Sequence, residues 1–353
     1  MDGDKLQDEI FEQLAEALDK LPNRFPRTPS NVEIPMLKKI FSEEEASLAI
    51  KLRGRMEPVD DIADRLGEPV KEVRSRLMKM VKRGLVWFDK EGGKPRFRLA
   101  PFIVGIYESF LEEMDHEFSH LFEQYMLDGG TAGIMKADPS LTRVIPAKDT
   151  AKAEWILPYD DVVEIINNAE SFKVQDCICR KQKDFLHRNC DYPLKNCLSF
   201  SNSVRSGSED SISREESLKI IDECEEIGLV HTVSNVREGV GYICNCCGCC
   251  CGILRSINEL GIENSIAYAN YYAEVNAESC SSCGECIERC QVYAIKETDE
   301  ASFVIREKCI GCGLCVSGCV SDAVHLHLKP EAEIVHPPVD YQEWEKVRMA
   351  NRT

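Results

Sequence analysis

The feature that most constrains this chain is a cysteine motif that occurs twice near its C-terminal end. The two copies are in register 29 residues apart, so that Gly284 corresponds to Gly313 and Ala294 to Ala323. A chance repeat of such close spacing is implausible, and thiols at these intervals are typical metal ligands. The two copies are Cys280-x2-Cys283-x2-Cys286-x3-Cys290 and Cys309-x2-Cys312-x2-Cys315-x3-Cys319.

The spacing within each copy suits a [4Fe-4S] cubane. Three thiolates of a CxxCxxC loop can bind three corners of one cluster, while the fourth cysteine points toward the other cluster. In these residues the segment resembles the bacterial two-cluster ferredoxins. The resemblance implies one cluster held by Cys280, Cys283, Cys286 and Cys319, and a second held by Cys309, Cys312, Cys315 and Cys290.

The segment departs from that family at one position in each copy. The family usually has a proline after the fourth cysteine, whereas this chain has Gln291 and Val320. The departure concerns the local loop geometry and the potential rather than the ligands. The alternative to iron is a pair of four-thiolate zinc ribbons, but these seldom place all four cysteines so close together.

Ten further cysteines form two groups in the middle of the chain, and they predict a third metal site, either an iron–sulfur cluster or zinc. Neighbouring cysteines cannot all face one metal, so some are non-ligands or serve a second site. Which of them are ligands stays open, and Arg180 could balance the charge of a thiolate cluster. The ten are Cys177, Cys179, Cys190, Cys197, Cys244, Cys246, Cys247, Cys249, Cys250 and Cys251.

Two Cys-Cys-Gly triplets, 246–248 and 250–252, resemble the cysteine-rich domain of heterodisulfide reductase subunits, although the spacing differs. That family carries a noncubane cluster that performs thiol chemistry. The resemblance adds an alternative, a thiol/disulfide-type oxidoreductase subunit that uses the Cys244–Cys251 site. The remaining cysteine, Cys224, lies in an apolar helix and is expected to be a buried, unreactive thiol.

The distribution of cysteines also bears on the cell compartment. All 19 lie between Cys177 and Cys319, and their number is odd. The chain begins without an export signal and has no apolar run long enough to span a membrane. These features predict a cytoplasmic protein with reduced thiols. The net charge of −18 argues against bulk attraction to nucleic acid or to a membrane surface.

The N-terminal half predicts a different kind of domain. Helices are expected at 43–53, 59–66 and 69–83, followed by strands at 85–88 and 96–99 around a turn. This order resembles the winged helix-turn-helix domains of bacterial regulators. Residues 68–98 hold ten basic and four acidic side chains, an excess of six, so the rest of the chain carries −24. Such a patch could contact DNA phosphates, or the domain could dock a protein or dimerise.

A long helix is expected from Pro101 to about Leu127. It contains His116-Glu117-Phe118-Ser119-His120, the HExxH pattern of zinc peptidases. The helical period places both histidines opposite the apolar face, on the solvent side, where a catalytic zinc would lack a walled cleft. A chance match is therefore the favoured interpretation.

Together these patterns predict an α+β multidomain protein, and residues 155–327 resemble the dicluster ferredoxin-like proteins of anaerobes. The expected function is single-electron transfer to or from a partner oxidoreductase, and no membrane partner is expected. A redox-sensing DNA-binding regulator is the alternative. A homodimer is left open. An electron carrier or an oxidoreductase subunit is expected in preference to a stand-alone enzyme. The expected domains are an N-terminal helix and linker (1–35), a winged-helix-like domain with the long helix (36–127), a linker (128–154), a cysteine-rich α/β domain (155–275), a ferredoxin-like two-cluster module (276–330) and a tail (331–353).

Overall fold

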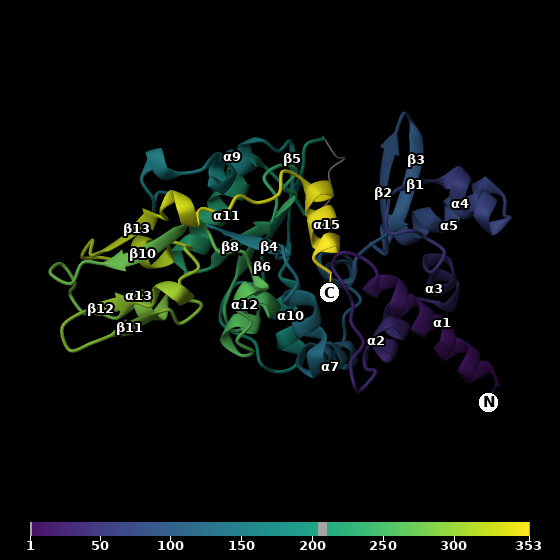
Figure 1. The fold of residues 1–353 in the computed structure, drawn as a ribbon, viewed down its shortest axis with the longest axis horizontal. Coiled ribbons are helices and arrows are strands. Elements are labelled where there is room, and N and C mark those ends of the chain that lie inside the picture. Colours follow the sequence, from purple (N-terminus) through teal and green to yellow (C-terminus); the bar gives the residue numbers. More distant parts are fainter. Residues whose placement is uncertain (1, 204–209, 353) are drawn as a thin grey trace. The chain divides into compact units, whose positions relative to one another are not determined.

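A computed structural model describes residues 2–203 and 210–352, and the chain divides into two units (Figure 1). The first unit comprises residues 1–134 together with 185–187, and the second comprises 135–184 and 188–353. Each unit has its own elements and is described by itself.

The first unit is mostly helical and carries one small antiparallel sheet. The sheet has the order β1-β3-β2, in which Val86 pairs with Leu99. The strands are β1 (Glu57–Pro58), β2 (Val86–Glu91) and β3 (Lys94–Leu99). The helices are α1 (Asp2–Asp19), α2 (Glu33–Ile40), α3 (Glu43–Ala49), α4 (Val59–Leu66), α5 (Val70–Lys82), α6 (Tyr107–Ser109), α7 (His116–Tyr125) and α8 (Thr131–Met135), with π-helical turns at Phe102–Ile106 and Met126–Gly130.

The region from α3 to β3 has the element order and nearly the bounds that the sequence predicts. Gly67 ends α4 in the left-handed region, with φ of 67°, which glycine adopts without steric cost. Helix α5 then buries Val73, Leu77 and Met80, which recur at helical spacing. The β2–β3 hairpin follows directly.

Residues 20–32 contain no helix or strand, as the sequence predicts, although Phe25 is fully buried and α2 already begins at Glu33. One expectation for this unit is wrong. The single helix expected from Pro101 is interrupted, since residues 103–105 have non-helical backbone angles. A new helix, α7, begins after Asp115, whose carboxylate caps it by accepting a hydrogen bond of 2.7 Å from the Phe118 amide.

The second unit is built on an antiparallel sheet. Within the described residues its strands have the order β4-β8-β9-β6-β5-β7, and each neighbouring pair is antiparallel. The expected α/β domain is therefore an antiparallel sheet with helices packed on it. The strands are β4 (Thr142–Ile145), β5 (Ser171–Asp176), β6 (Lys195–Ser201), β7 (Ser211–Ile212), β8 (Val230–Ser234) and β9 (Tyr242–Cys246).

Helices α9 and α11 cover an apolar face of this sheet, and Ile166 and Ile221 pack against Phe200 and Val233 there. Helix α11 begins with the capping box that the sequence predicts, formed by Ser213 and Glu216. The longer helices of the unit are α9 (Val162–Asn167), α10 (Ile178–Phe185), α11 (Arg214–Glu226), α12 (Gly252–Asn258) and α15 (Tyr341–Ala350), and short 3-10 turns lie at Ala153–Trp155, Pro158–Asp160, Glu263–Ser265, Arg306–Lys308 and Glu331–Glu333.

The segments expected as a linker and a C-terminal tail contain regular elements of this unit. The expected linker 128–154 contains strand β4, whose four residues are all buried and pair with β8. The expected tail contains helix α15, where Trp344 and Arg348 are each 2% exposed. Their side chains bond to the chain before β4: Trp344 Nε1 donates to Ser140 O at 3.0 Å, and Arg348 Nη1 donates to Ala137 O at 2.7 Å.

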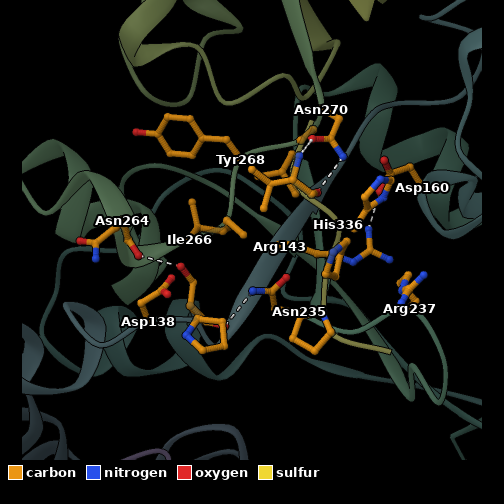
Figure 2. Close-up of a pocket in the computed structure, with 18 of the residues that line it drawn as sticks. Asp138, Arg143, Asp160, Asn235, Arg237, Asn264, Ile266, Tyr268, Asn270 and His336 are labelled. Carbon is orange, nitrogen blue, oxygen red and sulfur yellow. Dashed lines mark hydrogen bonds and ion pairs between the residues drawn. The ribbon is translucent and has the colours of Figure 1, made fainter. Parts of the chain in front are cut away.

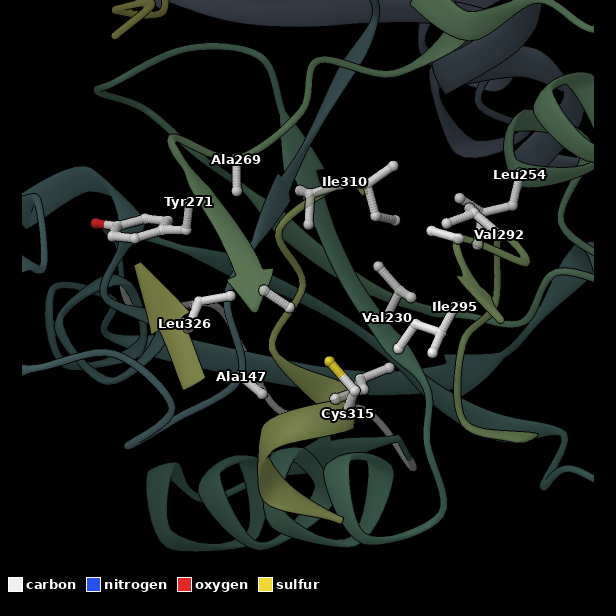
Figure 3. Packing of buried hydrophobic residues seen from close by; sticks show 14 of the residues in the cluster. Ala147, Val230, Leu254, Ala269, Tyr271, Val292, Ile295, Ile310, Cys315 and Leu326 are labelled. Carbon is white, nitrogen blue, oxygen red and sulfur yellow. The ribbon is translucent and has the colours of Figure 1, made fainter. Parts of the chain in front are cut away.

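Two small pairs of antiparallel strands accompany the repeated motif. One pair flanks the motif in the chain, and the other lies between its two copies. Strand β10 pairs with β13 over five residue pairs, and β11 pairs with β12. One apolar core runs from the large sheet into this region, as Figure 3 shows for Val230, Leu254, Val292 and Ile310. The elements are β10 (Tyr271–Val275), α13 (Glu285–Glu288), β11 (Ile295–Glu297), β12 (Ser302–Val304), α14 (Leu314–Ser317) and β13 (Val324–Leu328).

No helix in the described part of the chain has the length and apolar character needed to cross a membrane.

Candidate metal centres

The two copies of the repeated motif have the same local structure. Gly284 and Gly313 adopt φ angles of 80° and 76°, and each precedes a one-turn helix, α13 or α14. A side chain at Gly313 would also collide with Thr150, since its Cβ would lie 2.3 Å from Thr150 Oγ1. Glycine at these two positions therefore lets each cysteine loop turn sharply into its helix.

Two small cavities lie beside these loops, and four cysteines line each of them. Each cavity takes three cysteines from one copy and the fourth from the other, the grouping that the ferredoxin resemblance implies. One is lined by Cys280, Cys283, Cys286 and Cys319, and the other by Cys290, Cys309, Cys312 and Cys315.

Backbone amides point at several of these sulfurs. The amides of Ala294 and Ala323 donate to the sulfurs of Cys290 and Cys319, each at 3.2 Å. The Ser302 amide is the main cause that lowers the pKa of Cys280. Hydrogen bonds to sulfur favour the charged thiolate, which is the form that binds metal.

Four central cysteines form a compact group, which we call the tetrad: Cys190, Cys247, Cys249 and Cys250. Their Sγ atoms all lie within 4.8 Å of one another. The Sγ of Cys190 is 3.9 Å from that of Cys247 and 3.6 Å from that of Cys250, and the Cys249 and Cys250 sulfurs are 3.8 Å apart. Hydrogen bonds from Cys249 and Cys250 hold the pKa of Cys247 far below its usual range.

The other six central cysteines form a second group, which we call the thiol ring. Each thiol lies beside two others that affect its pKa, and the sequence of neighbours closes on itself. Hydrogen bonds from Cys244 and Cys251 lower the pKa of Cys246 to about 6. The order around the ring is Cys177, Cys197, Cys244, Cys246, Cys251 and Cys179.

The fold explains how neighbouring cysteines reach different groups. Cys244 and Cys246 are two residues apart on β9, so their side chains point to the same face of the strand. Cys247 follows the strand and turns into the tetrad. Cys251 comes after the tetrad loop, directly before α12, and returns to the ring. The sequence predicts one third site, whereas the structure gathers its ten cysteines into two groups.

Arg180 lies between the tetrad and the thiol ring and is only 3% exposed. Its guanidinium donates to Asn196 Oδ1 and to the Asn245 carbonyl, both at 2.9 Å. Burial alone would lower the pKa of Arg180, but the nearby thiols, led by Cys177 and Cys247, raise it above the ordinary value. Arg180 is thus a buried cation held by neutral groups and facing sulfur.

Gln291 connects the ferredoxin-like segment to the tetrad, and the sequence alone did not indicate this role. Its side chain accepts a hydrogen bond of 2.7 Å from the Gly248 amide and donates one of 2.8 Å to the Gly228 carbonyl. A side chain at Gly248 would not fit, because its Cβ would lie 2.2 Å from the Gln291 carbonyl oxygen. The residue that replaces the family's proline therefore holds the Cys247–Cys249 loop against Cys290.

Three other groups singled out in the sequence lie outside the cavities, the tetrad and the thiol ring. Cys224 is buried, and burial raises its pKa to about 12, as expected for an unreactive thiol. His231 is held by Asn245 Oδ1 at 2.6 Å and Glu225 Oε1 at 3.1 Å. His116 and His120 are exposed on α7, with their Nε2 atoms 3.3 Å apart, so the prediction that they face solvent is confirmed.

A further pocket of the second unit lies at strand β4 and has no cysteine in its lining (Figure 2). It has a volume of about 680 Å³, and Arg143, Asn235, Tyr268 and His336 are among the residues that line it. Arg143 forms a buried ion pair of 2.6 Å with Asp160 on its wall. Burial raises the pKa of Asp160 to about 6 despite that arginine. The pocket thus combines a largely apolar lining with one buried ion pair.

One comparison with known proteins bears on these centres. The family model described as the 4Fe-4S dicluster domain matches residues 272–320, the segment that contains both four-cysteine cavities. No curated protein matches the chain. The chain is therefore similar, over residues 272–320, to ferredoxin-type 4Fe-4S domains.

Proposed function

We propose that this protein is an electron carrier that holds two [4Fe-4S] clusters in residues 280–319 and exchanges single electrons with a partner oxidoreductase. The observation that carries the proposal is the pair of cavities, each lined by four cysteines drawn from both copies of the motif. The donor set fits, since four thiolates around one cavity are what a cubane needs. Cys280, Cys283, Cys286 and Cys319 would hold one cluster, and Cys309, Cys312, Cys315 and Cys290 the other.

The surroundings of the two cavities suit this role. Ile295 and Ile310 lie in the apolar core beside them and are 2% and 1% exposed. An apolar, water-poor shell together with amide hydrogen bonds to sulfur is the means by which a protein tunes a cluster potential. When bound, such clusters supply one-electron transfer, and the chain positions and shields them.

The tetrad fits a single tetrahedral metal ion. Four sulfurs around one ion lie about 3.8 Å apart when each metal–sulfur bond is about 2.3 Å long. The Cys190–Cys247, Cys190–Cys250 and Cys249–Cys250 Sγ distances run from 3.6 to 3.9 Å. Zinc, or a mononuclear iron, is therefore the proposed occupant of Cys190, Cys247, Cys249 and Cys250.

A redox-sensing DNA-binding regulator is the second candidate, and one observation favours it. Lys71, Arg74, Lys79 and Lys82 are exposed on α5, on the side opposite its buried residues. A helix that follows a turn and presents bases in this way can contact phosphates, as winged helices do. The other use of a winged-helix domain is docking of the partner oxidoreductase.

Anaerobic purification followed by reductive titration tests the main proposal. The expected result is about eight irons and eight sulfides from the ferredoxin-type domain and an EPR signal of two interacting reduced clusters. Cys312→Ser should alter or remove the signal of one cluster, whereas Cys224→Ser should leave both. Fewer than about eight irons after reconstitution, or no reducible signal, would contradict the proposal.

Salt-dependent DNA binding separates the second candidate from docking. A regulator should bind duplex DNA at low salt, lose affinity steeply as salt rises, and respond to cluster oxidation. Reversing the four α5 charges should abolish that binding without changing the iron content. If neither the oxidised nor the reduced protein binds DNA at low salt, the regulator hypothesis is wrong.

A further inference from the structure

The thiol ring is a metal-thiolate arrangement that the two ferredoxin-type clusters and the tetrad do not use. Each of its six thiols lies beside two others. Cys244 and Cys246 share one face of β9, and Cys197 lies on β6, the strand that pairs with β9. Four of them, Cys177, Cys197, Cys246 and Cys251, are 5 to 8% exposed. Thiols are weak hydrogen-bond donors and acceptors, so their mutual contacts are a poor substitute for water. Metal–thiolate bonds would stabilise these buried thiols far more than their contacts with one another do.

The ring differs in size from the tetrad. Within the described residues, the tetrad is the group of three or more thiol, imidazole or carboxylate ligands whose atoms all lie within 4.8 Å of one another. No three ring thiols meet that limit, although each contacts its two neighbours. A single tetrahedral ion needs four sulfurs about 3.8 Å apart. The ring is therefore too open for one ion, and atoms other than protein sulfur must fill its centre.

The charge of Arg180 points to an anionic occupant. Among the residues that the structure describes, no carboxylate pairs with this guanidinium, and its Nε has no hydrogen-bond partner. A buried cation requires a compensating negative charge. Cluster sulfide is an acceptor for an unpartnered N–H group, and thiolate-bound iron–sulfur clusters are anions. The ring supplies the ligands. Arg180, which lies near Cys177 and Cys246 of the ring as well as Cys247 of the tetrad, supplies counter-charge.

We propose that the thiol ring of Cys177, Cys179, Cys197, Cys244, Cys246 and Cys251 holds a polynuclear iron–sulfur cluster with inorganic sulfide, separate from the tetrad ion. The central cysteines then form two sites of different chemistry, joined by the chain from Cys246 to Cys251. This inference rests on the proposed function in one respect. The iron and sulfide of the two clusters in residues 280–319 must be subtracted from the total before the ring cluster can be counted.

The position of the ring gives this cluster an electronic connection. Cys246 and Cys251 belong to the same apolar core as Cys286 and Cys315 of the ferredoxin-type segment. A packed, water-free path of this kind suits electron exchange between the centres. The additional cluster would accept or deliver the electrons that the two ferredoxin-type clusters carry.

The test counts iron, acid-labile sulfide and zinc per chain in the full-length protein, purified and reconstituted without oxygen. The wild type should hold sulfide clearly above about eight per chain. Cys244→Ser/Cys246→Ser should lose that excess sulfide and its iron. Cys247→Ser/Cys249→Ser should lose about one metal ion and no sulfide, and Cys224→Ser should lose nothing.

The outcomes separate this inference from the electron-carrier proposal. Sulfide of about eight in the wild type, or excess sulfide that survives the ring variant, overturns the inference while leaving the two ferredoxin-type clusters intact. Excess sulfide lost from the tetrad variant alone overturns it as well. If the ring variant does not fold, judged by circular dichroism, the wild-type and tetrad-variant counts decide by the same criteria.

Discussion

At the scale of single residues, Gln291 shows how one departure from a family pattern can serve a neighbouring site. The equivalent residue of the second copy, Val320, is 87% exposed and contacts little. Gln291 is 9% exposed, and its side chain also donates to the Tyr192 hydroxyl at 3.1 Å. The residue after the fourth cysteine therefore differs in role between the two copies. Gln291 in the first copy bonds to the tetrad loop, whereas Val320 in the second copy faces solvent.

Replacing Gln291 with alanine should destabilise the second unit. The Gly248 amide and the Gly228 carbonyl would lose buried partners, which costs about 1–3 kcal/mol for each unsatisfied group. We expect the free energy of unfolding to fall by that order and the tetrad to lose metal more readily to a chelator. Urea denaturation and the rate of metal loss measure the two effects.

Val320→Ala is the matched control and should change neither quantity. Gln291→Pro, which restores the family residue, should keep both ferredoxin-type clusters and still loosen the tetrad. Chelator resistance equal to that of the wild type in Gln291→Ala would show that the tetrad loop does not depend on this side chain.

At the scale of elements, helix α15 acts as a clamp on the start of the large sheet. Trp344 packs against the segment before β4, and its indole N–H satisfies the Ser140 carbonyl. Arg348 satisfies a carbonyl of the same segment. Strand β4 and helix α15, which lie some 200 positions apart in the chain, thus close the same edge of the second unit.

Trp344→Ala should cost about 3–5 kcal/mol of unfolding free energy, the range for truncating a buried aromatic side chain. The loss should appear in the second unit, because the residue lies there. Met349→Ala, on the exposed side of the same helix, should change the stability by less than about 0.5 kcal/mol. Thermal and urea unfolding of both variants compare the two. A neutral Trp344→Ala would mean that α15 does not clamp the sheet.

The sequence predicts elements well where one local signal decides them. The capping box of α11, the turn at Gly67 and the cysteine repeat are of this kind. Sequence-based prediction fails where an element forms only through contacts with residues distant in the chain. Thr142–Ile145 becomes a strand only because β8 lies beside it, and α15 is ordered by carbonyls near residue 140. The division of the central cysteines into two groups follows from pairing between β6 and β9, which spacing along the chain does not reveal.

One local signal could have indicated part of that division. Cys244 and Cys246 alternate along a strand, so they share a face, and Cys247 cannot share it. The ring neighbour of Cys244 outside this pair, Cys197, comes from β6, and finding it required the strand order. Alternation thus separates neighbours, but only the fold supplies the remaining ligands.

At the scale of the whole molecule, the cysteines divide the chain into a unit that holds all of them and a unit that holds none. All 19 lie between residues 177 and 319, in the second unit, whereas the first unit contains none. The first unit is stabilised by apolar packing such as that of Phe25 with Phe102 and Tyr125. Metal binding is coupled to folding only where the ligands are.

Removal of iron and zinc under reducing, oxygen-free conditions should therefore affect the two units differently. Thiols packed as closely as those of the tetrad and the ring lose the bonds that bring them together, so the second unit should open. We expect amide hydrogen exchange, followed by mass spectrometry, to accelerate by at least about tenfold in peptides from β5, β6, β9 and the 272–320 segment, which corresponds to about 1.4 kcal/mol or more of lost local stability. Peptides from residues 8–134 should exchange at unchanged rates, and reconstitution with iron and sulfide should restore protection. If both units lost protection together, the first unit would have to draw its stability from the metal-bound second unit, and the two would fold as one cooperative body.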